Sequence, residues 1–423
     1  MEKVTLNQRE QQRLKVLNEV NLGKLRLKQA AMLMEISLRH TKRLLAGYRR
    51  EGATALAHGN RGRPPVNWIE TNIREQVVEL AGSKYSGFNQ QHFTEKLQEQ
   101  EGISLSRSSV RRILLNQGIR SPQKRRAPKH RSRRERYPQA GMLLQTDGSL
   151  HDWLEGRGPR LCLIGAIDDA TNEVPYAYFQ DQEDTAGYMQ MLQEITLRQG
   201  IPLALYHDQH SIFEVSADKF PSLEEQLAGK RPLTQIGRLL KELGINSISA
   251  NSPQAKGRVE RLWKTFQDRL VSELRLAGAR TKAEANQGLS RFLSDYNRKF
   301  TVKARESGTA YQKPQEGFKP EEWFCFKYPR TVGTDNVVRF NQHRLQILAT
   351  PQRQSYARCR VEVQQRLDGR LAIYYEGQPL DTQLAPIEAT ALRKSNIPPV
   401  IISSHKPEVK VASRSPWRQW VHR

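Results

Sequence analysis

A run of basic residues between positions 120 and 136 limits how this chain can fold more than any other feature of its sequence. Within the run, Glu135 is the one acid that opposes the positive charge. The cations are Arg120, Lys124, Arg125, Arg126, Lys129, Arg131, Arg133, Arg134 and Arg136. Like charges at this density repel one another, so the run cannot fold by itself before phosphates neutralise it. It therefore predicts a basic linker over residues 121–138 between separately folded parts, with a merely solvated spacer as the alternative.

The whole chain is basic, with 68 Lys and Arg against 44 Asp and Glu and a formal net charge of +24. A protein this basic usually binds a polyanion, most often nucleic acid, although a ribosomal or simply soluble basic protein is the alternative. No run approaches the roughly 20 apolar residues of a membrane span, and the first residues lack the apolar core of a signal peptide. Three scattered cysteines argue against a disulfide framework. These features predict a cytoplasmic protein without a membrane partner.

Residues 1–58 predict a helix-turn-helix domain. A short helix from Leu27 is followed by a turn at Glu35, and Ser37 can cap a second helix that ends before Gly52. The outer face of the second helix carries Arg39, His40, Lys42 and Arg43. A helix, a tight turn and a basic second helix are typical of DNA-binding domains. An ordinary helical hairpin is the alternative, since Glu35 stands where many such turns have Gly.

Residues 71–120 predict a second helix-turn-helix domain. A helix over residues 88–100, a turn at Gly102 and a helix capped by Ser106 repeat the first arrangement. The exposed face of the last helix carries Arg107, Arg111 and Arg112. Two such units in tandem would bind a longer DNA site than one.

The linker between them, residues 59–70, contains the sequence Arg61-Gly62-Arg63-Pro64-Pro65. It resembles the core of an AT-hook, in which an extended Arg-Gly-Arg-Pro strand lies in the narrow minor groove of A·T-rich DNA. The negative potential of that groove attracts Arg. We therefore expect Arg61 and Arg63 to contact DNA, with a plain linker as the alternative.

From Gly141 the pattern changes to strands. Three strands followed by alternating helices and strands predict an α/β domain over residues 139–305. After a linker over residues 306–322, short alternating segments within residues 323–385 predict a small β-barrel. Residues 386–423 are rich in Pro, Ser and basic residues, which predicts a disordered tail.

Three acids stand at the ends of predicted elements in the α/β domain. Asp147 closes the first strand, Asp208 closes the fourth, and Glu260 lies in the first turn of a long helix. Carboxylates at the ends of adjacent strands are natural ligands for hard divalent cations such as Mg²⁺. Two such ions about 4 Å apart can activate the attacking oxygen and neutralise the leaving oxygen in phosphodiester cleavage. Each acid also has a simpler interpretation, as a turn residue or as a complement to the helix dipole.

Other residues compete for the same roles. The nearby acids are Asp152, Asp168, Asp169 and Glu214. The flanking strands predict that Asp168 and Asp169 form a hairpin turn. His207 and His210 could suggest zinc, but no second pair of ligands accompanies them.

Three segments around the acids resemble the catalytic blocks of the DDE transposases and retroviral integrases. They are residues 144–149, 206–208 and 252–260. The third is the most specific, because a Pro-Gln turn, a short stretch ending in Gly257 and a helix-borne Glu occur together. The resemblance covers about residues 141–299, and the flanking domains suit bacterial insertion-sequence transposases of the integrase-like type. Residues 151–158 are similar to the ISNCY group.

The resemblance implies an RNase H-like core in which Asp147, Asp208 and Glu260 hold two Mg²⁺ ions, for which Mn²⁺ can substitute. It implies an enzyme, a polynucleotidyl transferase and endonuclease, that binds the terminal inverted repeats of its element and joins the cut ends to target DNA. A complex that holds two ends implies a homodimer or homotetramer, associated with the bacterial nucleoid.

Lys256 and Lys264 would hold DNA phosphates beside the metals, although a salt bridge with Glu260 is the alternative. One feature departs from the pattern of the retroviral enzymes. The interval between Asp208 and Glu260 is longer than in the retroviral enzymes, with residues 210–231 as an insertion. The rival functions are a non-catalytic DNA-binding regulator with an integrase-like core, and a nuclease or resolvase that cleaves without joining.

Overall fold

The computed structural model describes residues 5–122, 127, 135–215, 233–250, 257–351 and 353–386. By their contacts they fall into two units, residues 1–132 with 265–278 and residues 133–264 with 279–423. No helix in the described part of the chain is long and apolar enough to cross a membrane.

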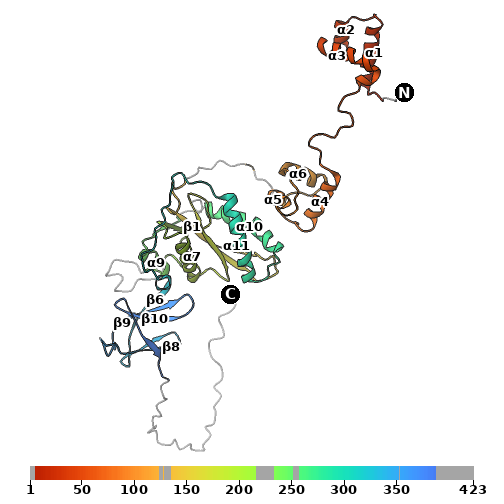
Figure 1. The fold of residues 1–423 in the computed structure, drawn as a ribbon. Helices are drawn as coiled ribbons and strands as arrows, with labels where there is room; N and C mark the ends of the chain where they lie inside the picture. The colour runs from red at the N-terminus through yellow and green to blue at the C-terminus, as the bar shows by residue number, and fades with distance from the viewer. Residues whose placement is uncertain are drawn as a thin grey trace, which may run out of the picture. The chain divides into compact units, whose positions relative to one another are not determined.

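The first unit begins with helices α1 (Gln8–Asn21), α2 (Leu27–Leu33) and α3 (Leu38–Glu51), followed by the 3₁₀ helix η1 (Gly52–Leu56) (Figure 1). Ser37 caps α3 as predicted, since its side chain accepts a hydrogen bond from the His40 amide. The three helices and η1 share one small core, to which Leu17, Ala30, Met34, Leu45 and Leu56 contribute. The short helix, the turn and the basic helix of the sequence analysis are therefore present.

Glu35, in the turn between α2 and α3, has a φ of 53°. This is the left-handed region, where the Cβ atom of an L-residue approaches the following carbonyl oxygen and costs about 1 kcal/mol relative to Gly. Glu35 thus has a backbone conformation that favours Gly, and its Cβ atom destabilises the turn.

A second group of helices follows in the same unit: α4 (Thr71–Gly82), α5 (Gln90–Gln100) and α6 (Arg107–Asn116). The predicted helix over residues 88–100 begins two residues later, because Asn89 is its N-cap. Ser106 caps α6 as expected. These helices have their own core, centred on Val77, Phe93, Leu97, Val110 and Leu114.

Residues 265–278 belong to the first unit because α5 packs against them through charged contacts. They are the second half of helix α10 (Gly257–Leu276). Arg269 forms an ion pair with Glu95 at 2.8 Å, and Lys96 forms one with Glu273 at 2.7 Å. Burial raises the pKa of Glu273, but its hydrogen bonds to His92 and Lys96 outweigh this effect and lower it. The Glu273 carboxylate is therefore charged at neutral pH.

The second unit contains a five-stranded sheet in the order β3-β2-β1-β4-β5. The strands are β1 (Leu144–His151), β2 (Leu161–Asp168), β3 (Tyr176–Gln180), β4 (Ala204–His207) and β5 (Asn246–Ser249). β1 to β3 are antiparallel neighbours, whereas β4 is parallel to β1 and β5 is parallel to β4. This mixed α/β arrangement fits the expected RNase H-like core.

Helices cover both faces of this sheet (Figure 1). α7 (Thr185–Arg198) and α9 (Gln235–Glu242) pack on one face and contribute to a large apolar core. The first half of α10 lies on the other face. α11 (Lys282–Phe300) runs along edge strand β3, where Asn286 exchanges two hydrogen bonds with the Phe179 backbone and Asn297 does the same with Val174. These amides occupy the backbone groups that an edge strand would otherwise leave unpaired.

Asp147 does not close the first strand as predicted, because β1 continues to His151. Its pairing with β2 extends over the whole segment, with Asp147 opposite Gly165 and His151 opposite Leu161. Gly148 and Ser149 are therefore extended residues and not part of a turn.

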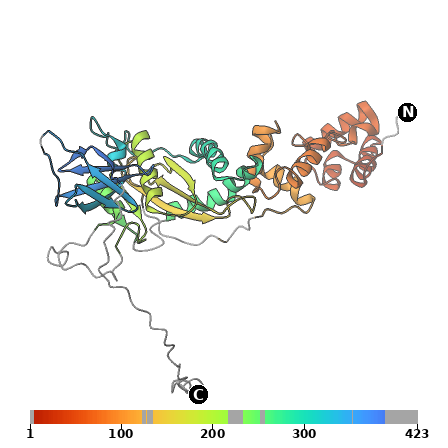
Figure 2. The same cartoon turned by 90° about the horizontal axis from the view of Figure 1, so that it is seen from below.

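A small β-barrel was expected within residues 323–385, but the C-terminal strands form two separate sheets and no closed barrel among the described residues (Figure 2). A short helix, α12 (Pro320–Trp323), precedes them. One sheet holds β6 (Cys325–Thr331), β9 (Arg360–Arg366), β10 (Leu371–Tyr375) and β11 (Gln378–Leu380), and the other holds β7 (Val337–Phe340), β8 (His343–Ile347) and β12 (Thr382–Leu384). Both sheets contribute to a single core that includes Phe340, Ile347, Val363 and Ile373. β6, β11 and β12 were not predicted.

Replacing Glu35 with Gly should stabilise the α2–α3 turn. The substitution removes the Cβ contact at positive φ, which is expected to gain about 1 kcal/mol and so to slow amide exchange in α2 and α3 about fivefold. Hydrogen exchange followed by mass spectrometry measures this locally. Glu35→Ala is the matched control, since it removes the charge but keeps Cβ; equal protection in both variants would contradict the strain.

Candidate active site and nucleic-acid interface

The pairing of β1 with β4 governs the relation between Asp147 and Asp208. Leu144 pairs with Leu205 and Gln145 with Tyr206 in parallel register. Continued by two residues, this register sets Asp147 opposite Asp208, the residue that directly follows β4. Neighbouring strands lie about 4.8 Å apart. Two carboxylates that are 61 residues apart in the sequence are thus on adjacent strands, and both are half-buried.

Glu260 lies in the first turn of α10, which is tied to β1 at two points. The Val259 amide donates to the Gln145 side-chain oxygen at 3.4 Å. One turn further along, the Trp263 indole Nε1 donates to Asp147 Oδ2 at 3.1 Å. Side chains alternate along a strand, so Gln145 and Asp147 both face α10 while Thr146 and Gly148 face α7. The exposed Glu260 side chain therefore lies in the turn that contacts Gln145, one turn before the residue that contacts Asp147.

A glycine makes room for the Trp263 ring. A Cβ atom at Gly165, opposite Asp147 on β2, would lie 3.3 Å from the ring of Trp263 and 2.7 Å from the Ala177 side chain. Gly165 thereby allows the indole to approach the strand pair closely enough for its hydrogen bond to Asp147.

The donor set of the three acids suits a hard divalent cation, which prefers carboxylate oxygens. Within the part of the chain that the structure describes, however, no three His, Cys, Asp or Glu side chains gather closely enough to hold an ion. Asp147, Asp208 and Glu260 therefore stay proposed ligands.

Glu183 is a further acid beside the site that the sequence analysis missed. A Cβ atom at Gly148 would lie 2.6 Å from a Glu183 carboxylate oxygen. The same carboxylate accepts a hydrogen bond from the Tyr188 hydroxyl at 2.5 Å. Burial, with Glu183, Asp147 and Asp208 nearby, raises the pKa of Tyr188 well above its usual value. Gly148 in a strand was the one signal of this close approach.

The competing residues have structural roles. Asp168 forms the predicted turn, accepting hydrogen bonds from the Ala170 and Thr171 amides. Asp152 accepts one from the Gly156 amide, and Glu214 is bonded to Ser249. His207 contacts the Asp208 carbonyl through one ring nitrogen and the Ser247 hydroxyl through the other, and stacks on Phe213.

Asp169 lies in the predicted turn as well, but its side chain has a further partner outside the turn. It is fully buried, and its carboxylate pairs with Arg258.

The helical residues predicted to bind DNA are exposed, apart from one. Arg39, Lys42 and Arg43 on α3 and Arg107, Arg111 and Arg112 on α6 are accessible, while His40 is half-buried. Desolvation, together with the charges of Arg43 and Arg13, lowers the pKa of His40, so this side chain is neutral at pH 7. The others are available as cations.

Arg61 and Arg63 differ from the expected AT-hook geometry. Residues 58–62 form turns and are not extended, with Gly62 at a φ of 77°. The Arg61 guanidinium is engaged by the buried Glu10 of α1 and by the Thr5 carbonyl. Arg63 is exposed.

Several predicted DNA-binding residues lie outside the described residues. They are Lys124, Arg125, Arg126, Arg131, Arg133, Arg134 and Lys256. Lys264 is described and exposed on α10, one turn after Glu260.

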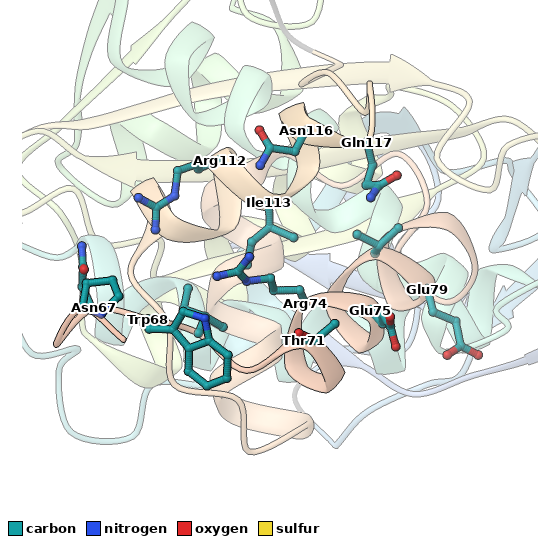
Figure 3. Close-up of a pocket in the computed structure, with 13 residues that line it drawn as sticks. Asn67, Trp68, Thr71, Arg74, Glu75, Glu79, Arg112, Ile113, Asn116 and Gln117 are labelled. Atoms are coloured by element: carbon teal, nitrogen blue, oxygen red, sulfur yellow. The ribbon is translucent and has the colours of Figure 1, made fainter. Parts of the chain in front are cut away.

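A cavity of about 730 Å³ lies between α4 and α6 in the first unit (Figure 3). Figure 3 shows Trp68 at one side of it, with Arg74 from α4 and Arg112 from α6 directed towards it. The acids Glu75 and Glu79 line the same cavity. Its two cations are thus balanced by two acids, and the cavity is not an anion site by its own charge.

The chain is similar to two curated transposases. It is 33% identical over 382 residues to the transposase y4bF of Sinorhizobium fredii, which is 89% of this chain and 81% of that protein. It is also 33% identical over 326 residues to the transposase for insertion sequence IS1202 of Streptococcus pneumoniae, with 69% of this chain and 68% of that protein covered. No family model matches the chain. The chain belongs to the transposases, and among these to the transposases of bacterial insertion sequences.

Solved structures add little. A chain from the simian T-cell lymphotropic virus intasome, in complex with a PP2A regulatory subunit, is 14% identical, with a TM-score of 0.30, and 74% of this chain and 100% of that chain are covered. The catalytic core of HTLV-2 integrase with magnesium is 14% identical, with a TM-score of 0.25, 35% of this chain and 83% of that chain covered. Because both scores are low, the family assignment rests on the sequence relatives.

Proposed function

We propose that this transposase cleaves the DNA ends of its insertion sequence and joins them to target DNA, with Asp147, Asp208 and Glu260 acting as one catalytic site. The observation that carries the proposal is the parallel register of β1 and β4, in which Leu144 pairs with Leu205 and Gln145 with Tyr206; continued by two residues, it would set Asp147 opposite Asp208. The contacts of Val259 and Trp263 with β1 bring the first turn of α10 to the same strand. Membership of the insertion-sequence transposases supports the reaction class.

The three carboxylates would hold two Mg²⁺ ions, or Mn²⁺ in their place, since their oxygens are the ligands that such cations prefer. Bound there, the ions would supply Lewis-acid activation of the attacking oxygen and neutralise charge on the leaving oxygen. Two of the three carboxylates are half-buried and one is exposed, so all can reach a bound phosphodiester.

This chain's own residues would orient the reacting groups. Trp263 holds Asp147 by the hydrogen bond from its indole nitrogen, which limits the rotation of the carboxylate. Lys264 would bind a DNA phosphate beside the site, together with Lys256. Joining then proceeds by direct attack of the DNA 3′ hydroxyl on the target phosphodiester, so no Ser or Tyr nucleophile of the protein is required.

The exposed cations of α3 and α6 would bind the terminal inverted repeats. Each lies in a helix that follows a tight turn, and side chains near the start of such a helix can reach base edges in the major groove. Two ends must be held in one complex for joining, so we propose a homodimer or homotetramer on DNA.

Asp147→Asn should lower the joining of a pre-cut element end to plasmid DNA by more than about 100-fold. Loss of a group that merely supports a metal ligand costs about 10- to 100-fold, and loss of a ligand should cost more. Gel shift with the same end measures binding, which should stay within twofold of wild type.

Asp152→Asn is the matched control, since Asp152 is a nearby acid beyond the end of β1 and should keep full joining. Joining by Asp147→Asn at the wild-type rate would sink the carboxylate assignment. Binding by wild type without any joining would favour the non-catalytic regulator, and cleavage without joining would favour a nuclease or resolvase.

Replacing Arg39, Lys42 and Arg43 together by Gln should weaken end binding and its salt dependence. The slope of log K against log salt concentration is negative, and each phosphate contact that is lost makes it less steep by about 0.9. Fluorescence anisotropy over a range of salt concentrations measures both quantities. Arg49→Gln with Arg50→Gln, at the far end of α3, is the control and should change the slope less. An unchanged slope in the triple variant would remove α3 from the DNA interface.

A further inference from the structure

Among the described residues of the second unit, the most completely buried carboxylate lies beside the proposed site and not in it. Asp169 follows β2 and is 0% exposed. Its Oδ1 accepts hydrogen bonds from Arg258 Nε at 2.6 Å and from Gln145 Nε2 at 3.0 Å, and its Oδ2 accepts one from the Tyr137 amide at 2.9 Å. The side chain of Arg258 is 12% exposed.

Gln145 extends this network to the backbone of α10. Its amide nitrogen donates to Asp169, and its amide oxygen accepts from the Val259 amide. Amides in the first turn of a helix generally lack an acceptor within the helix. Because Val259 is buried, Gln145 provides the acceptor that water would provide at an exposed position. One side chain therefore joins β1, the loop after β2 and the start of α10.

Two members of the network lie close in sequence to proposed metal ligands. Gln145 is two residues before Asp147 on the same face of β1, and Arg258 is two residues before Glu260 in the first turn of α10. A shift of the first turn along β1 would therefore have to break the contacts of both residues.

Stability alone is a weak explanation of the network. A buried ion pair is often no more stabilising than apolar residues of the same volume, because both charges lose their hydration. Arg258 also lies in the first turn of a helix, where the helix dipole disfavours a cation. A fixed position of α10 gives the arrangement a reason that stability alone does not.

We propose that Asp169, Gln145 and Arg258 are positioning residues that hold the first turn of α10 against β1 and so set the place of Glu260 relative to Asp147. The proposal rests on the proposed catalytic roles of those two acids. Asp169, Gln145 and Arg258 do not contact the reacting atoms.

The main alternative is that Arg258 binds a DNA phosphate directly. Asp169 separates the two explanations, because a fully buried anion cannot contact DNA. If Arg258 served as a phosphate ligand, Asp169→Asn would leave the joining rate at saturating DNA unchanged. If the network positions Glu260, Asp169→Asn must lower that rate.

The test compares Asp169→Asn, Gln145→Met and Arg258→Lys with wild type in three measurements. These are the single-turnover joining rate at saturating pre-cut end, the Kd for the end, and the midpoint of thermal stabilisation by Mn²⁺ without DNA. We expect Asp169→Asn and Gln145→Met to join about 10- to 100-fold more slowly, since misplacing a reacting group by 1 Å can cost about 100-fold. The Kd should stay within twofold, and the Mn²⁺ midpoint should rise several-fold.

Arg258→Lys keeps the positive charge opposite Asp169. It should therefore keep most of the wild-type joining rate and a Mn²⁺ midpoint close to that of wild type. Arg238→Gln is the control for a lost ion pair elsewhere in the second unit, since Arg238 pairs with Glu242 at 2.7 Å, and it should leave all three measurements unchanged. If circular dichroism reports that Asp169→Asn is unfolded, Gln145→Met and Arg258→Lys decide the question.

Two results would overturn the proposal. One is a wild-type joining rate and Mn²⁺ midpoint in Asp169→Asn and Gln145→Met. The other is a raised Kd with an unchanged rate at saturating DNA, which would indicate a phosphate contact. Asp147→Asn, measured alongside, separates the two hypotheses: if it also joins at the wild-type rate, the proposed catalytic site has failed and not the positioning network alone.

Discussion

Strand β1 is hydrogen-bonded along both of its edges, and the arrangement of the site depends on this. Its antiparallel pairing with β2 keeps residues 144–151 extended through Gly148, and its parallel pairing with β4 sets the level of Asp208. Because side chains alternate along a strand, a shift of one residue would turn Asp147 away from α10. The buried apolar face towards α7, with Leu144 at its start, makes such a shift costly.

Helix α10 adds the third acid by contacts that differ in kind from strand pairing. Apolar residues at helical spacing bury one face of it, and Val259, Leu262 and Phe266 are 0–1% exposed. Such packing tolerates small sliding, whereas the hydrogen bonds of Trp263 and Gln145 to β1 have defined directions. Apolar burial would thus hold the helix on the sheet, and the polar contacts would determine where along β1 its first turn stops.

The parts of this fold that depend on neighbours in sequence were predictable, and those that depend on distant partners were not. Ser37 and Ser106 are recognisable as helix caps because the groups that they bond lie three residues away. Asp147-Gly148-Ser149 has the composition of a turn, and only pairing with β2 keeps it in a strand.

Asp168 and Asp169 both lie at the predicted turn and are indistinguishable in the sequence, yet the Asp168 side chain bonds within the turn and that of Asp169 pairs with Arg258, 89 residues away. The three proposed ligands were found through the resemblance of their segments to a known family, while Glu183 has no such signal of its own.

The catalytic role of Glu260 is best tested by Mg²⁺-dependent joining of a pre-cut element end to plasmid DNA by wild type and Glu260→Gln, with Glu214→Gln as the acid control. If Glu260 is a ligand of the catalytic metal ions, wild type and Glu214→Gln will join the end, and Glu260→Gln will not join it although it binds the end equally. Joining by Glu260→Gln at the wild-type rate would contradict this role.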